Sequence, residues 1–297
     1  MSNKLRKMTL EKKHNLTGWA FLAPATFLIA VFSFWPMIKA LVLSFQTGKG
    51  RNMQMAGFTN YIRMFQDDVF IQSIKNTFFY FIIQVPIMLV VALVLACILN
   101  KKDLRFKGFF RTMIFVPCTT SLVAYSIIFR SLFANDGLVN YVLVNLGILD
   151  KPYNFLTQPF AAKMVILLGL LWRWTGYNMV FFLSGLQNIE YSVYEAAKID
   201  GASAIQTFFK ITVPLLKPTI LLTAIMSTNG TLQLFDESVN LTDGGPANAS
   251  ISMSHYIYNL CFKYVPNFGY AAAMSFFILL LVAVLAFIQM RVGDKRD

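Results

Sequence analysis

Long apolar runs, separated by short polar and basic segments, dominate the sequence. Each run has about 20 residues or more, the length that a helix needs to cross the hydrocarbon core of a bilayer. Strands of a membrane barrel would instead give short segments of alternating polarity. The pattern therefore predicts an all-α integral membrane protein with about six transmembrane helices. The predicted spans are Trp19–Leu43, Thr77–Leu99, Phe109–Phe133, Phe160–Leu186, Val213–Phe235 and Tyr270–Met290.

Basic residues gather in alternate connections between these spans, at 4–13, 101–111, 198–217 and 291–296. The positive-inside rule places such connections in the cytoplasm. We therefore expect a cytoplasmic N-terminal tail at 1–18, one transmembrane domain at 19–290 and a cytoplasmic C-terminal tail at 291–297. The first apolar run has a basic flank like that of a signal peptide, but it is longer than a typical h-region, so we interpret it as a span.

The amino-acid composition narrows the class of protein further. Of the 297 residues, 57% are hydrophobic and 13% are charged, which leaves too little polar material for the surface of a soluble globular protein. The net charge of +12 would suit nucleic acid, but the bases lie in short loops beside the spans and form no continuous stripe. The three cysteines and two histidines have no metal-binding or disulfide spacing, so we expect neither a metal site nor a disulfide framework.

Two outer connections carry local patterns. We expect 48–57, which has glycine at Gly48, Gly50 and Gly57, to be a flexible outer connection. The segment Phe58–Lys75 has aromatic and aliphatic residues at roughly helical spacing, which predicts a short helix on the outer membrane face. The segment Asn135–Gln158 predicts another short amphipathic helix.

The cytoplasmic segment between the fourth and fifth spans predicts two short helices joined by a bend. Ser192 to Glu195 has the S-x-x-E form of a capping box, and Ser203 to Gln206 has the S-x-x-Q form. Gly201 suits the left-handed end of the first helix. At about eight residues and roughly 12 Å, that helix is too short to cross a bilayer, so it lies in the cytoplasm or at the interface.

Small residues along the first of these helices suggest a contact surface. Ala197 and Gly201 are four residues apart and Ala202 adjoins them, so one face carries almost no side chain and fits a groove of another protein. Pro214 and Pro218 suit the first turns of the returning span. The alternative is an ordinary interfacial loop.

These residues resemble the EAA loop of permease subunits of ABC importers, here at 187–218. The match runs through Glu195, Ala196, Ala197, Asp200, Gly201, Ala202, Phe208, Ile211, Pro214 and Pro218. Further segments are similar to the carbohydrate branch of that family and cover nearly the whole chain. They are Phe21–Pro24, Phe58–Tyr61, Asn76–Thr77, Phe110–Thr112, Phe115–Pro117, Phe235–Asp236, Leu241–Pro246, Tyr256–Tyr258 and Gly269–Ala273. Glu190, where proline is usual, and Arg130, near a usual tryptophan, depart from the family pattern.

The resemblance implies a non-catalytic permease domain in a bacterial cell membrane. Its partners would be a second homologous permease, two ATP-binding subunits and an extracellular or periplasmic solute-binding protein. The residues from Glu195 to Gly201 would form the coupling helix in the ATPase cleft. The sequence has no G-x-x-x-x-G-K-[ST] loop to hold phosphates, so we expect this chain to bind no cofactor, with ATP and Mg on the partner subunits.

Arg173 lies near the middle of the fourth predicted span, where a charge costs about 2.5 to 3.5 kcal/mol and therefore faces protein or a watery cavity. One interpretation makes it a hydrogen-bond donor in the substrate pathway, with Trp172, Trp174 and Tyr177 offering flat faces to sugar rings. The other pairs it with an acidic group or backbone carbonyls of the partner permease.

The fifth predicted span is polar from Ser227 to Gln233. Asn229 and Gln233 share a face, and both amides donate and accept hydrogen bonds, which suits sugar hydroxyls. Hydrogen bonding between helices is the competing explanation. We also assign Phe235 and Asp236, which follow this span, to the substrate pathway.

The expected function is a permease subunit of an ATP-driven sugar importer, for an oligosaccharide such as a galactoside of the raffinose or melibiose type. The alternative within transport is another polar solute such as glycerol phosphate, which would call for more than one base in the pathway. A stand-alone channel leaves the coupling segment without a role. A membrane enzyme would need converging catalytic groups that the spans do not show.

Overall fold

The computed structural model describes residues 10–49, 52–101 and 103–293. Residues 1–9 of the N-terminal tail and 294–297 of the C-terminal tail lie outside the described residues. Three π-helical segments, Ala30–Phe34, Phe208–Thr212 and Asn259–Lys263, interrupt or extend helices. The helices and strands are α1 (Leu10–Ile29), α2 (Trp35–Ser44), β1 (Gln46–Lys49), β2 (Asn52–Met55), α3 (Thr59–Met64), α4 (Asp68–Asn100), α5 (Lys107–Thr119), α6 (Leu122–Leu132), α7 (Leu138–Asn145), α8 (Pro159–Gln187), α9 (Tyr191–Ile199), α10 (Ala204–Thr207), α11 (Val213–Leu215), α12 (Lys217–Leu232), α13 (Asp236–Thr242), α14 (Met253–Tyr258) and α15 (Phe268–Gly293).

Helices long and apolar enough to cross a membrane occur at all the predicted places. Within the described residues there are four such helices, at His14–Ser44 and in α4, α8 and α15. Two further helix pairs pass the same test together, α5 with α6 and 204–215 with α12, but they bend by 98° and 69°. A mostly helical membrane protein with four to six candidate spans is thus confirmed, and two of the six predicted places hold a sharply bent helix pair.

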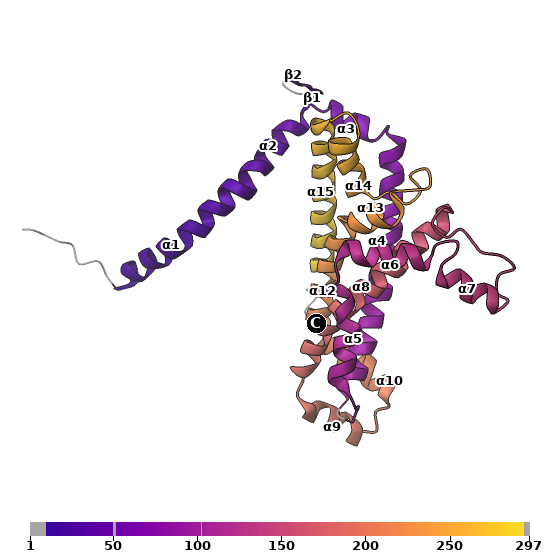
Figure 1. Cartoon of the computed structure of the whole chain (residues 1–297). Helices are drawn as coiled ribbons and strands as arrows, with labels where there is room; N and C mark the ends of the chain where they lie inside the picture. The colour runs from indigo at the N-terminus through magenta and orange to yellow at the C-terminus, as the bar shows by residue number, and fades with distance from the viewer. Residues whose placement is uncertain (1–9, 50–51, 102, 294–297) are drawn as a thin grey trace, which may run out of the picture.

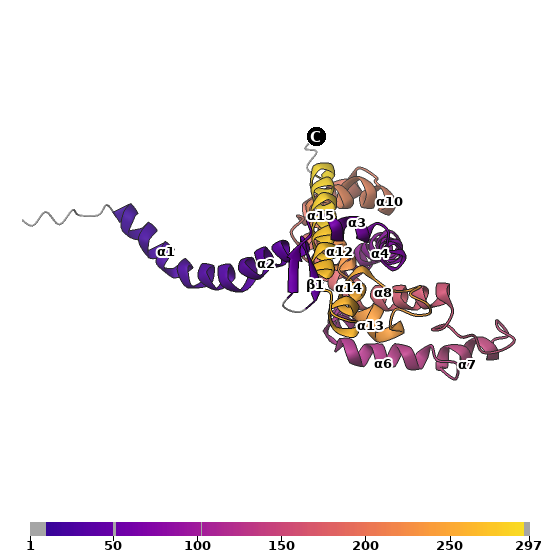
Figure 2. The ribbon, with the colours of Figure 1, turned by 90° about the horizontal axis from the view of Figure 1, so that it is seen from above.

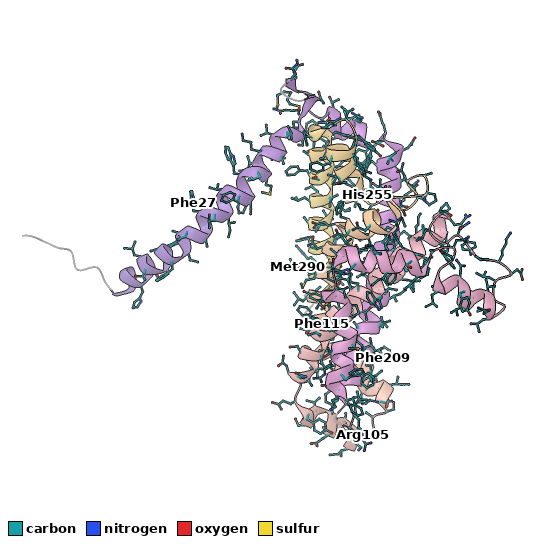
Figure 3. All side chains as sticks on the ribbon, viewed as in Figure 1. Phe27, Arg105, Phe115, Phe209, His255 and Met290 are labelled. Atoms are coloured by element: carbon teal, nitrogen blue, oxygen red, sulfur yellow. The ribbon has the colours of Figure 1, made fainter. Side chains whose placement is uncertain are left out.

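The first span stands apart from the rest of the molecule. Every side chain from His14 to Lys39 is exposed, and Phe27 projects from α1 toward no neighbouring element (Figure 3). Only the end of this span, α2, packs against α15. In two perpendicular views it runs away from the helical bundle (Figures 1 and 2). The apolar surface of α1 is therefore left for lipid or for another subunit to cover.

The bundle is built around α4 and α8, which share the most extensive contact in the fold. Its cytoplasmic half, by the predicted topology, is a cluster of buried side chains from α4 and α8 together with Leu216. Gly176 of α8 allows the backbone of α5 to approach closely, because a Cβ atom there would lie 1.9 Å from the carbonyl oxygen of Ile114. Close backbone contact at small residues is the usual way in which membrane helices pack.

The outer connections differ from the sequence prediction in two places. The segment expected to be a flexible connection forms an antiparallel hairpin of β1 and β2, in which Gln46 pairs with Met55. The helix expected over Phe58–Lys75 is interrupted: α3 ends at Met64, and α4 begins at Asp68. The side chain of Asp67 causes the new start, because it accepts hydrogen bonds from the amides of Val69 and Phe70. The second outer helix, α7, is confirmed.

Asp67 also ties three helices together. Its second carboxylate oxygen accepts hydrogen bonds from the hydroxyls of Tyr256 and Tyr270, each at 2.7 Å. Burial alone would raise the pKa of Asp67, but these two bonds and the two amides outweigh burial and hold the pKa below its ordinary value. The start of α4 is therefore fastened to α14 and to α15.

Candidate functional site

A cavity of about 420 Å³ lies between α4, α8, α12 and α13. Its lining mixes apolar and aromatic side chains with amides, hydroxyls and three charged groups. Six of the residues predicted for the substrate pathway meet there, and two do not. The six are Arg173, Trp174, Tyr177, Gln233, Phe235 and Asp236.

Arg173 is 6% exposed and binds backbone carbonyls of its own chain. One guanidinium nitrogen donates to the carbonyl of Thr120 at 3.0 Å, and the other to that of Cys118 at 3.5 Å. These carbonyls end α5 where the broken span turns into α6, so the arginine neutralises the negative end of a helix. The sequence analysis named an acidic group or carbonyls of a partner permease as the alternative, whereas the two carbonyls bound here belong to this chain.

The two remaining pathway candidates lie elsewhere. Trp172 is 45% exposed and stacks on Tyr125, away from the cavity. Asn229 lines a separate groove with Ser254 and Ser275, and Gln233 reaches both spaces. The Gln233 amide donates to the Asn229 side chain. These two amides are thus engaged with each other on the face of α12.

Other polar residues of α12 bond between helices, as the competing explanation proposed. Thr231 donates to Gln84 of α4 at 2.7 Å, and Ser227 donates to Asn178 of α8 at 3.3 Å. Gln289 of α15 donates to Thr228 at 2.7 Å. Ser227 and Thr231 still line the cavity, so their bonds also shape its wall.

Sequence reasoning missed three polar residues of the lining. Gln84 and Asn178 sit in apolar runs, and Glu237 follows Asp236 at the start of α13. Glu237 is 4% exposed. The signal was available for Gln84 and Asn178, because an amide within a membrane span indicates a protein-facing position. For Glu237 the sequence offered only its place beside a residue already assigned to the pathway.

The α9–α10 segment has the predicted bend. α9 ends in a Schellman motif: Gly201 has φ of +75°, its N–H donates to Lys198, and the N–H of Ala202 donates to Ala197 at 2.9 Å. The capping box of Ser203 and Gln206 is present at the start of α10. The Ser192 box is wrong, because α9 begins at Tyr191 and Ser192 donates to Glu190 instead.

Only part of the small-residue face expected to be a contact surface is exposed. Ala197 is buried within this chain, whereas Glu195, Ala196, Asp200 and Gly201 are exposed and Ala202 is partly buried. Pro214 is exposed in α11. The most prominent apolar side chains are ones that the sequence analysis did not name. They are Ile199 at 86%, Ile205 at 72% and Phe209 at 64% exposed.

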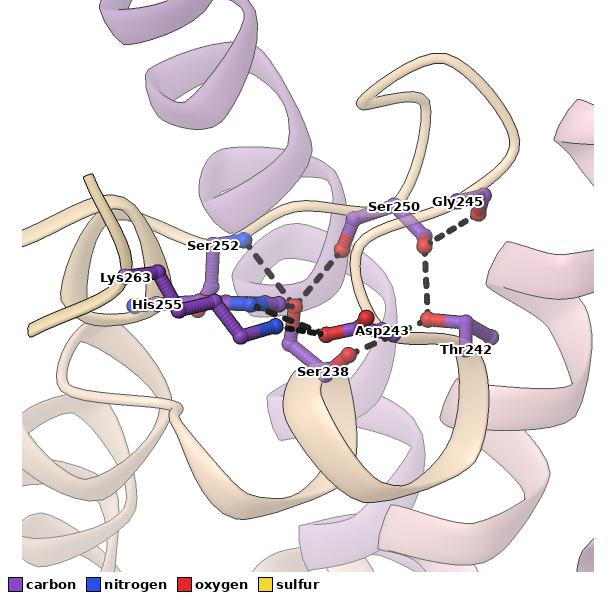
Figure 4. Close-up of polar contacts among 8 residues, drawn as sticks. All are labelled: Ser238, Thr242, Asp243, Gly245, Ser250, Ser252, His255 and Lys263. Carbon is purple, nitrogen blue, oxygen red and sulfur yellow. Dashed lines mark hydrogen bonds and ion pairs between the residues drawn. The ribbon is translucent and has the colours of Figure 1, made fainter. Parts of the chain in front are cut away.

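A polar loop follows α13 and is held by a buried network (Figure 4). Ser238 donates to the carbonyl of Ser250 at 3.1 Å, so its oxygen accepts from Nδ1 of His255 at 3.0 Å. This assigns the proton of His255 to Nδ1. Nε2 is buried without a hydrogen-bond partner, 3.7 Å from Asp243, which also binds Lys263 at 2.6 Å. Desolvation lowers the pKa of His255 to about 4, and the opposing attraction of Asp243 is weaker.

Comparison with known families identifies the family of this chain. Residues 69–296 match the family described as binding-protein-dependent transport system inner membrane component. The chain belongs to this family. It is accordingly an integral membrane permease, a transport component and not an enzyme.

Relatives and solved structures agree with this assignment of the permease. The chain is 51% identical over 292 residues to the lactose transport system permease protein LacF of Rhizobium radiobacter, covering 98% of each. It is 33% identical to the multiple sugar-binding transport system permease protein MsmF of Streptococcus mutans, covering 97% of this chain and 99% of that one. A bacterial ABC transporter that imports alginate has the same fold, with TM-score 0.84, 23% identity and coverage of 95% and 96%.

Proposed function

We propose that this permease is the translocation subunit of an ABC importer for sugars. The observation that carries the proposal is the cavity lined by amides, hydroxyls and the rings of Trp174 and Tyr177. Such a lining offers both donors and acceptors to sugar hydroxyls and flat faces to sugar rings. The relatives named for lactose and for arabinooligosaccharides support an oligosaccharide as cargo. A galactoside of the raffinose or melibiose type remains the finer form of the proposal.

The ATP-driven step enters through α9 and α10. α9 and α10 lie at the end of the molecule opposite the β-hairpin (Figure 1). We use the name apolar knob for three exposed side chains, Ile199 of α9, Ile205 of α10 and Phe209 of the adjoining segment Phe208–Thr212. We infer that two ATP-binding subunits, which would carry ATP and Mg, receive this knob and its counterpart on a second homologous permease. The Schellman end of α9 supports a lever role, because it fixes the direction in which the chain leaves the helix.

The orientation of the chain in the membrane follows from the position of α9 and α10. Arg105, one of the basic residues of 101–111, is seen at the α9–α10 end (Figure 3), and Lys198 lies in the last turn of α9. The first described turn of α1 and the end of α15 both point away from the hairpin end (Figure 1). We place the α9–α10 end and both termini in the cytoplasm, and the binding protein at the hairpin end.

Glycerol phosphate is less well supported than sugar as cargo. A phosphate ester needs cationic groups free to bind it. Arg173 is the one cation among the described residues that line the cavity, and it already holds the carbonyls of Thr120 and Cys118.

Two measurements test the proposal. Proteoliposomes that contain the complete importer should take up labelled oligosaccharide when ATP and binding protein are present, and competition among sugars identifies the cargo. Ile199→Ser should abolish co-purification of the ATPase subunits, whereas Ile148→Ser, the same change at a 63% exposed position in the outer segment, should not. Retention of the ATPase by Ile199→Ser together with Ile205→Ser would refute the docking role.

A further inference from the structure

The charged side chains that line the cavity differ in how far other groups of the protein already engage them. The lining contains one cation, Arg173, and two carboxylates, Asp236 and Glu237, among the described residues. Both carboxylates come from the first turn of α13, which forms one wall. Asp236 is half-buried and Glu237 is 4% exposed, so water screens neither fully.

The cation is already committed. Its two terminal nitrogens bind carbonyl oxygens, and its guanidinium lies over the rings of Tyr125 and Trp174 at 5.2 and 5.5 Å. Only Nε is buried without a hydrogen-bond partner. The two bonds use one N–H of each terminal nitrogen, and the carbonyl dipoles they meet already offset part of the guanidinium charge. The buried Nε–H can donate to one hydroxyl or ether oxygen of a neutral sugar.

The carboxylates outweigh the cation or balance it. Burial and the neighbouring charge of Asp236 raise the pKa of Glu237, while its own backbone amide and Arg173 act in the opposite direction. With Glu237 ionised the three groups sum to one negative charge. With Glu237 protonated, Asp236 alone still balances Arg173. In neither case is positive charge left over for an anionic solute.

We propose that Asp236 and Glu237 are specificity-determining residues that make this cavity accept uncharged saccharides and reject anionic ones such as uronates, sulfonated sugars and sugar phosphates. The inference rests on the proposed function in naming the solute as a saccharide. The electrostatic statement itself concerns only the cavity.

The test measures the potential inside the cavity directly. Ser227 lines the cavity, and the near-isosteric change Ser227→Cys places a thiol there after Cys97, Cys118 and Cys261 have been changed to alanine. In the purified complete importer, the rates of modification by a cationic, an anionic and a neutral methanethiosulfonate are compared at pH 8. Each reagent's rate is divided by its rate with a small thiol in solution, which removes differences in intrinsic reactivity. Reaction that also occurs in the importer without Ser227→Cys is subtracted.

The cationic reagent should react faster than the anionic one. The cation-to-anion ratio should fall about tenfold in Asp236→Asn combined with Glu237→Gln, since the charge of each reagent then meets Arg173 alone. Asp150→Asn removes the same charge from an exposed outer loop and should leave the ratio unchanged. The rate with the neutral reagent measures how accessible the thiol is. If the double variant fails to assemble, the single variant Asp236→Asn takes its place.

Preference for the anionic reagent in the unaltered cavity would overturn the inference without any charge variant. An unchanged ratio in Asp236→Asn, with the neutral rate preserved, would do so as well. Sugar uptake is scored separately, so an importer that carries no sugar but shows the expected ratio refutes the proposed function and leaves the electrostatic assignment intact.

Discussion

Gly176→Ala should loosen the contact between α8 and α5. A Cβ atom at this position would lie 1.9 Å from the carbonyl oxygen of Ile114 and 2.7 Å from its carbon. Ordinary contact begins at 3.4 Å, so the two helices would have to separate by about 1.5 Å. The obstacle is backbone, and no side-chain rotation relieves it. Overpacking costs about 1 to 3 kcal/mol in well-packed cores, and we expect the upper end of that range here.

The assay is the thermal stability of the assembled importer in detergent, followed by size-exclusion chromatography after heating. A matched control lies in the partner helix: Gly108→Ala places its Cβ with no atom within 4 Å. Alanine favours helix over glycine by about 1 kcal/mol, so this variant should be neutral or slightly more stable. Gly185→Ala should fall between the two, because its nearest neighbours are the side chains of Leu216 and Thr219.

The graded order is the decisive result. If Gly176→Ala and Gly108→Ala lower the midpoint temperature by the same amount, close backbone approach does not limit the packing of α5 on α8. If Gly185→Ala is the most damaging, mobile side chains matter more than fixed backbone, and the reasoning is also refuted.

Three further outcomes follow. Arg173→Lys should destabilise the importer by about 1.5 to 3 kcal/mol, because one ammonium cannot serve the carbonyls of both Thr120 and Cys118; thermal stability alongside Arg130→Lys, an exposed control, measures it. The pKa of Asp67 is lowered in the folded protein, so its contribution to the free energy of unfolding is complete above the unfolded-state pKa of about 3.9 and is lost as pH falls through the folded-state pKa. Asp67→Asn should therefore flatten the acid side of a plot of stability against pH. The pKa of His255 is lowered to about 4 in the folded protein, so the unfolded chain takes up this proton first and stability declines as pH falls from about 6.5 toward 4. His255→Asn should remove that decline. An unchanged decline would contradict a lowered pKa for His255.

The spans were predictable because apolar length is a local property of the sequence. The same holds for the turn at Gly201 and the box at Ser203, whose partners lie within five residues. The hairpin was missed because alternation of polar and apolar residues is confined to the four residues 52–55, and the contact of β1 with α15 joins segments far apart in sequence.

The cavity was only partly predictable because four helices contribute to it. Arg173 and Trp174 attract notice as a charge and a large ring within an apolar run, and both line the cavity. The engagement of Arg173 with Thr120 could not be foreseen, since it requires the 98° break between α5 and α6. Trp172 looked equivalent to Trp174 in sequence, but residues two apart on a helix face different ways.

The isolated first span also bears on how the protein meets bilayers of different thickness. A helix packed within a bundle changes its tilt only by breaking contacts, whereas α1 has none with the described bundle and joins it only through α2 and the β-hairpin. Mismatch between a hydrophobic length and the local membrane is relieved by tilting at a modest cost per ångström. In this chain that adjustment falls on α1, and the joint where α2 meets α15 becomes the pivot that absorbs it.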